Sequence, residues 1–167
     1  MDIQFYLERL RASGEFKKFM KENPDAYICS CFFVIDLENP TNPDDKYQID
    51  FFSKKTNQLF SFNLEDEIKL VPLTNQENAP ILERISAESE LDFKEIEMMI
   101  FGEMGRQNIK NKMQKIIMVL QNNNGKDLWI CTVFISGLGL LKVNIDDSEK
   151  KITLFEKRSF LDMFKKF

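Results

Sequence analysis

The sequence contains no histidine, and this absence removes several kinds of active site at once. Ser–His and Cys–His nucleophile pairs are excluded, as is every metal site that uses histidine. Glycine is also scarce, with 6 residues among 167, and none of them form the GxGxxG or GxxxxGK[ST] loops that cradle phosphates. We therefore expect a protein that is not an enzyme and has no catalytic residues, no cofactor and no metal. An active site based on Asp or Lys is the least favoured alternative.

Long apolar runs and basic patches are absent too. No run can span a bilayer, and the amino terminus has neither a basic n-region nor an apolar h-region. The net charge is −4 and the lysines alternate with acidic residues, so we expect no nucleic-acid partner. The odd number of cysteines, 3, each within an apolar run, is typical of a reducing compartment. We expect a cytoplasmic protein without a membrane span.

Phenylalanine, by contrast, is abundant. The chain has 16 Phe against 1 Trp and 3 Tyr, and 43% of its residues are apolar. Since Phe carries no polar tip, most of these rings should lie in a core. The composition is that of a folded, globular chain.

The first half of the sequence predicts a helix followed by strands. Apolar residues at three- and four-residue spacing indicate an amphipathic helix over Asp2–Lys21, weakened at Ser13 and Gly14. The near-continuous apolar run Ala26–Ile35 predicts a buried central strand. A loop rich in Pro and Asx residues, Leu37–Asp45, comes next. Further strands are expected around Tyr47–Phe51, Leu59–Phe62 and Ile68–Val71.

The second half repeats this order. Asp92 and Glu95 have the spacing of a capping box at the start of a helix. The NNNG sequence at Asn122–Gly125 predicts a tight turn between two strands. The expected strands are Met113–Gln121, Leu128–Ile135, Leu141–Ile145 and Ile152–Phe155, followed by a short amphipathic helix over Ser159–Phe167.

These elements predict an α+β fold of two tandem helix-plus-antiparallel-sheet units with a short C-terminal helix. The first unit is 1–72, the linker 73–90 and the second unit 91–167. An internal repeat supports this division, because Tyr27–Phe33 aligns without a gap on Trp129–Ile135. The pairs Ile49–Asp50 and Ile145–Asp146 extend the match. Whether the halves form one sheet or two stays open.

The second half resembles a known family. The stretches Trp129–Val133 and Leu141–Asp146, followed by a polar turn and Ile152, are similar to the PepSY-type unit, a small cystatin-like α+β module. The similarity is strongest over Phe93–Phe155. Lys150 and, in the first copy, Asn57 stand where the family usually has a turn glycine. We also expect this chain to lack the secretion signal or membrane segment that is common in the family. The resemblance implies a binding or inhibitory element with no catalytic residue to carry over.

Two groups of residues could bind a metal. Cys29 and Cys31, two apart on a strand, should point to the same face, with Cys131 at the repeat-equivalent position of Cys29. A zinc site normally needs four ligands, so buried thiols in the core are the favoured interpretation. The acidic loop residues Asp36, Glu38, Asp44 and Asp45 lack the ligand spacing and glycine of a calcium loop. Solvated loop charge is favoured there.

Two apolar groups could form a binding surface. One is a set of methionines that could line an adaptable groove or simply fill the core: Met98, Met99, Met104, Met113 and Met118. The other is a C-terminal segment that could dock on a membrane or partner, or fold back onto its own sheet, which is favoured: Phe160, Leu161, Met163, Phe164 and Phe167, with Lys165 and Lys166.

The favoured function is a non-enzymatic protein- or peptide-binding or regulatory module whose partner is another protein or peptide. Its working surface would be an exposed strand edge or the groove between helix and sheet. The alternative is a small acidic dimeric chaperone-like protein. The sequence identifies neither the binding residues nor the oligomeric state.

Overall fold

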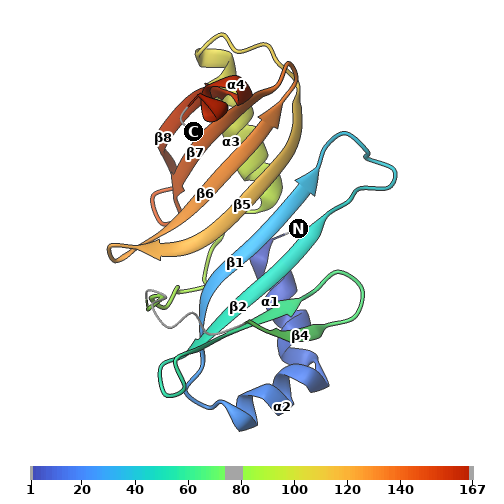
Figure 1. Cartoon of the computed structure of the whole chain (residues 1–167), viewed down its shortest axis with the longest axis vertical. Coiled ribbons are helices and arrows are strands. Elements are labelled where there is room, and N and C mark those ends of the chain that lie inside the picture. Colours follow the sequence, from blue (N-terminus) through green and yellow to red (C-terminus); the bar gives the residue numbers. More distant parts are fainter. Residues whose placement is uncertain (1, 74–80, 166–167) are drawn as a thin grey trace.

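The computed structural model describes residues 2–73 and 81–165. Its eight strands form one antiparallel sheet in the order β4-β3-β2-β1-β5-β6-β7-β8 (Figure 1). The strands are β1 Tyr27–Asp36, β2 Lys46–Ser53, β3 Gln58–Asn63, β4 Lys69–Pro72, β5 Met113–Asn123, β6 Lys126–Ile135, β7 Gly139–Asp146 and β8 Lys151–Ser159. The helices are α1 Ile3–Ala12, α2 Gly14–Glu22, α3 Phe93–Arg106 and α4 Phe160–Phe164. The prediction of an α+β fold with antiparallel strands is confirmed.

The two halves meet in the middle of the sheet, where β1 pairs with β5. Their register runs from Ser30 opposite Gln121 to Asp36 opposite Lys115. The main core also crosses this join, since the ring centroids of Phe33 and Trp129 lie 6.0 Å apart. The description as two helix-plus-sheet units therefore needs correction. One sheet and one main core unite both halves.

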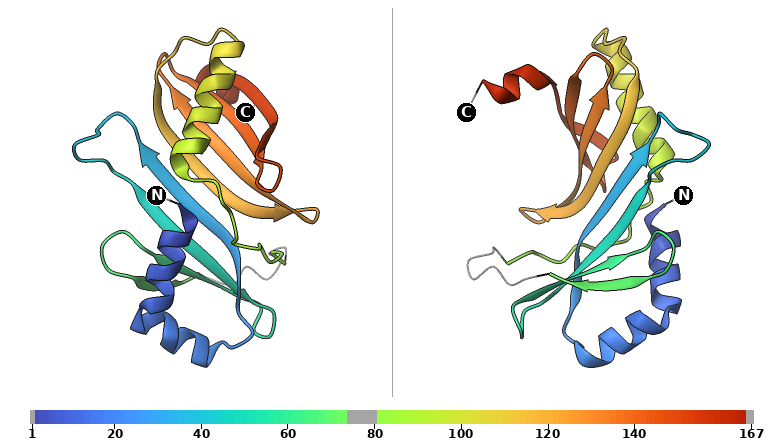
Figure 2. Two further views of the ribbon diagram at one scale, coloured as in Figure 1. Left: turned by 180° about the vertical axis from the view of Figure 1, so that it is seen from behind. Right: turned by 45° about the vertical axis from the view of Figure 1, so that its right-hand side comes forward.

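Three helices cover one face of this sheet. Figure 2 shows α1 and α2 against the first four strands and α3 against the last four. Phe19, Phe33 and Phe62 are among the largest fully buried side chains, which agrees with the expected phenylalanine-rich core. None of the described helices is long and apolar enough to cross a membrane.

The prediction of a single N-terminal helix is wrong, because the chain breaks at Ser13. This residue has extended backbone angles, φ −73° and ψ 146°, and its amide donates to Leu10 O. Its hydroxyl accepts a hydrogen bond from Phe16 N at 3.2 Å and so caps α2. Serine satisfies an otherwise unpaired helix amide in this way, and a new helix begins at once. The capping box of α3 is confirmed, with Asp92 and Glu95 each accepting the other's amide at 2.9 Å.

The strand alignment proposed from the repeat is also wrong. Tyr27–Phe33 lies in β1, the first strand of the first half, whereas Trp129–Ile135 lies in β6, the second strand of the second half. The strand that follows the helix of the second half is β5, the antiparallel neighbour of β1. The two aligned segments look alike because both are buried strands of β-branched and aromatic residues.

The favoured prediction, a C-terminal helix that folds back onto the sheet, is wrong for the described part of the helix. α4 extends away from the sheet on the side opposite α3 (Figure 2), and Leu161 is 67% exposed. The amide of Phe160 donates to Leu138 O, which attaches the start of α4 to the turn between β6 and β7. Residues 166 and 167 and the side chains of Met163 and Phe164 lie outside the described part.

Candidate functional site

The three cysteines are free and buried, and they do not form a common site. Cys29 is the extra residue of a β-bulge between Ile28 and Ser30, which shifts the register of β1 against β2. Cys31 therefore lies in the main core, while Cys29 packs with Tyr27 and Phe52 on the other face. The prediction that Cys29 and Cys31 share a face is wrong. Burial raises the pKa of Cys29 and of Cys131 to about 12, so these thiols stay protonated.

The acidic loop uses its carboxylates on its own backbone. Asp36 accepts hydrogen bonds from Asn39 Nδ2 at 3.0 Å, Asp44 N at 3.2 Å and Glu38 N at 3.0 Å. These bonds lower the pKa of Asp36 to about 2. Asp45 accepts from the Asp36 amide. Within residues 2–73 and 81–165 no group of acidic, Cys or His side chains is arranged to hold a metal ion.

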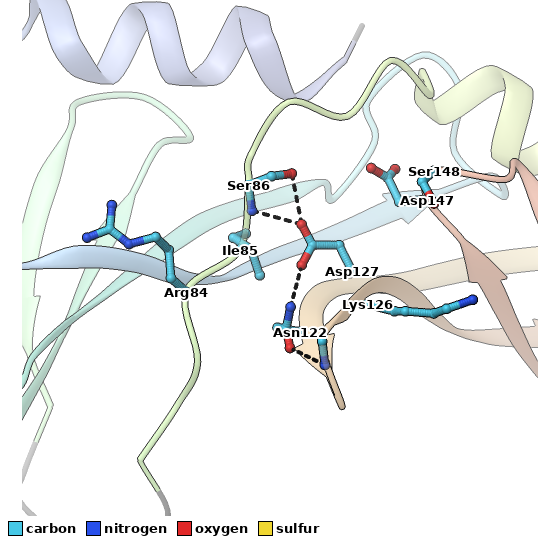
Figure 3. A pocket seen from close by; sticks show the side chains of 9 residues that line it. Arg84, Ile85, Ser86, Asn122, Lys126, Asp127, Asp147 and Ser148 are labelled. Carbon is cyan, nitrogen blue, oxygen red and sulfur yellow. Dashed lines mark hydrogen bonds between the residues drawn. The ribbon is translucent and has the colours of Figure 1, made fainter.

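A polar pocket of about 460 Å³ lies between residues 84–86 and the turns of the second half (Figure 3). Asp127, at the start of β6, accepts hydrogen bonds from both the amide and the hydroxyl of Ser86 at 2.8 Å. Its other oxygen accepts from Asn122 Nδ2 at 3.0 Å. Asp127 thus ties the segment that leads into α3 to the β5–β6 hairpin.

The neighbouring carboxylates of this pocket are engaged in the same manner. Asp147 accepts from Trp129 Nε1 at 2.7 Å and from the hydroxyl of Ser89. Asp146 forms an ion pair with Lys126 at 3.2 Å and accepts from Ser148 Oγ. Since these carboxylates already bind neighbouring donors, the arrangement holds the connecting segment in place. Sequence reasoning missed this cluster, because Ser86 and Asp127 are 41 residues apart.

The edge strand β8 presents a different kind of surface. It ends the sheet and runs for 9 residues, whereas the opposite edge strand, β4, has 4 and ends at Pro72. A bulge at Thr153 precedes a regular stretch in which Leu154 to Ser159 pair with Asn144 to Gly139. In an antiparallel edge strand, alternate residues direct their N–H and C=O groups away from the sheet. Within residues 2–73 and 81–165, β8 therefore offers unpaired backbone groups along its outer side.

A groove of about 410 Å³ lies between α3 and the start of β8. Met99, Glu103 and Arg106 line it from the helix, and Lys150, Lys151 and Ile152 line it from the turn and strand. Its volume falls within the range of known ligand pockets.

Of the five methionines that could have lined a groove, Met99 is the one that lines this groove among the described residues. Met104 and Met118 are buried, and Met113 packs against the core. Met98 is 64% exposed on the outer side of α3. Most of these methionines are therefore packing residues.

The edge strand β8 itself carries net positive charge. Arg158 pairs with Glu156 at 2.9 Å, Arg106 with Glu103 at 2.9 Å and Lys150 with Glu90 at 3.3 Å. Lys151 and Lys157 form no ion pair within the described residues. The strand itself has three basic residues and one acidic residue, a net charge of +2, in a chain of net charge −4.

Comparisons with known proteins identify a fold and no family. No protein-family model matches the chain, and no curated protein matches it. Among solved structures, the chain is similar to a protein of Clostridium difficile 630 proposed to be a lipoprotein. The identity is 12% and the TM-score 0.52, with 86% of this chain and 90% of that chain covered. At this identity the likeness concerns the fold alone.

Proposed function

We propose that this protein is a non-enzymatic binding module that takes up an extended segment of a partner protein along β8. The observation that carries the proposal is the long, exposed edge of β8, which in the described part of the chain pairs on one side only. An extended peptide can add to such an edge, because main-chain hydrogen bonds supply affinity and flanking pockets select side chains. The groove beside Met99 and Ile152 is positioned to receive a side chain of the added strand.

The polar pocket is a second concave site with convergent polar groups, and its contacts favour a structural role. Asp127 and Asp147 are committed to Ser86, Asn122, Trp129 and Ser89. A general base or nucleophile needs a group within reach of a substrate proton or carbon. We therefore propose that the module binds its partner without chemical change.

We also keep the PepSY-type relationship as a proposal. It is supported by the order of elements, since a helical segment is followed by four antiparallel strands in each half. The proposed location is the cytoplasm, which suits three free, buried thiols.

A displayed library of random ten-residue linear peptides, selected on the immobilised full-length chain, tests the proposed function. We expect enriched peptides to shift the backbone amide resonances of Leu154–Ser159. N-methylation of alternate peptide nitrogens should weaken binding about tenfold or more, whereas methylation of the intervening nitrogens should not, because only one set faces β8. Enriched peptides that shift β4 or the Asp127 pocket instead, or no enrichment, would contradict the proposal.

A further inference from the structure

We propose that the segment added along β8 is acidic, with apolar residues between its carboxylates. This inference rests on the proposed function of β8 and specifies the chemistry of the partner. It concerns two features of the same edge: its unpaired lysines and the groove beside them.

The lysines set the charge of the partner. Lys151 and Lys157 lie at the two ends of β8 and form no ion pair within the described residues, and both are exposed. Six residues of strand separate them by roughly 20 Å. The bulge at Thr153 places the two on opposite faces of the sheet, since Lys157 pairs with the core residue Leu141 and Lys151 pairs with Asp146. A carboxylate near each end of an added strand, one on each face, would complement this pair. The other basic residues here, Arg106, Lys150 and Arg158, already have acidic partners.

The groove beside Met99 and Ile152 favours an apolar residue between the carboxylates of the added strand. Met99 and Ile152 give it an apolar lining next to Lys151. Side chains of a strand alternate between its two faces, so every second residue of an added strand would face the helix side, where this groove opens. An aliphatic side chain there would bury apolar surface. One carboxylate on the other face would lie beside Lys151, and a second, farther along on the helix side, would lie beside Lys157.

Charge also argues against a second copy of this chain as the occupant. Pairing β8 with an identical strand would bring two segments of net charge +2 together. Like charges at an interface disfavour the wrong partner. An acidic segment would be attracted to β8, whereas a second copy of this chain would be repelled.

Three synthetic ten-residue Val-rich peptides, with Glu, Gln or Lys at two positions five residues apart, test the inference by fluorescence anisotropy on the full-length chain. This spacing places the two side chains on opposite faces of a regular strand, as the two lysines require. We expect the Glu peptide to bind about tenfold or more tightly than the Gln peptide, and the Lys peptide to bind weakest. The affinity of the Glu peptide should fall as NaCl rises from about 0.05 to about 0.5 M, because salt screens exposed charges.

A pair of charge-matched variants localises the effect. The double variant Lys151→Glu with Lys157→Glu should lose about tenfold or more in affinity for the Glu peptide, since two attractions become repulsions. Lys17→Glu with Lys18→Glu changes the net charge equally on exposed positions of α2. It should change the affinity less than about twofold. Circular dichroism should show both variants folded.

The outcomes separate the two proposals. If the selected library peptides shift the β8 amides but the Glu peptide binds no better than the Gln peptide, the acidic inference is wrong and the edge function stands. Equal losses in both double variants, or a stable homodimer through β8 by light scattering and amide shifts, would also overturn the inference. If no peptide shifts the β8 amides, the proposed function itself is wrong.

Discussion

The indole Nε1 of Trp129 donates a 2.7 Å hydrogen bond to a carboxylate oxygen of Asp147. Trp129 is fully buried and is the only tryptophan in the chain. The same carboxylate oxygen accepts from Ser89, in the segment that leads into α3. One side chain at the β7–β8 turn thus satisfies a core donor and fixes a connecting segment.

Replacing Asp147 should therefore destabilise the protein. Asp147→Ala leaves the buried indole N–H without its acceptor, which costs about 1–3 kcal/mol in the free energy of unfolding. Asp147→Asn keeps an acceptor and should lose less. Urea unfolding followed by the fluorescence of Trp129 measures both. The exposed Glu88→Ala is the control and should stay within about 0.5 kcal/mol of the parent protein. Equal losses for the Asn and Ala variants would show that the acceptor is not the cause.

The carboxylate of Asp36 should make stability depend on pH. Hydrogen bonds from Asn39, Asp44 and Glu38 lower its pKa from 3.8 to about 2. A lowered folded-state pKa contributes stability above the unfolded value, and this stability is lost as pH falls through the folded value. Asp36→Asn should thus lower the melting temperature above about pH 4, and the difference from the parent should shrink towards pH 2. A difference that stays constant from pH 7 to pH 2 would contradict this account.

Lys150 occupies the left-handed backbone region, with φ 50°. Asn57 occupies the same region, with φ 52°. A residue with a Cβ is strained there, whereas glycine is not.

Lys150→Gly should therefore be about 1 kcal/mol more stable than Lys150→Ala by urea unfolding. Comparing Gly with Ala cancels the lost ion pair to Glu90, which both variants lack. A Gly variant no more stable than the Ala variant would mean that the turn relaxes without strain.

The thiols should be unreactive in the folded protein. Burial raises the pKa of Cys29 and Cys131 to about 12 and that of Cys31 well above its usual value, so little thiolate forms near neutral pH. Labelling with a chromogenic disulfide reagent at about pH 8 should be slow and limited by unfolding. Denaturant should expose all 3 thiols. Rapid labelling of one thiol in the native protein would contradict this.

Local signals in the sequence predicted most strands and their turns. The apolar run that forms β1 and the NNNG turn between β5 and β6 both appear where expected. So does α3, since a capping box acts through neighbouring residues. These features depend on contacts within a few residues, which the chain order itself encodes. The break at Ser13 is also local. The sequence does not predict it, because a serine can either cap a helix or lie within one, and the two cases have the same local sequence.

The tertiary structure decided what depends on strand pairing. The bulge at Cys29 places that thiol and Cys31 on opposite faces of the sheet, because one extra residue in a strand reverses the face to which the following side chains point. The pairing of β1 with β5 joined the halves into one sheet, which left β8 as the long edge and made it the candidate site. The hydrogen bonds of Asp127 with Ser86 and of Asp147 with Ser89 likewise join residues that are 41 and 58 positions apart in the sequence. The composition and the order of the predicted elements therefore determined the α+β class and excluded histidine chemistry. The pairing of distant strands determined that β8 lies at the edge of the sheet.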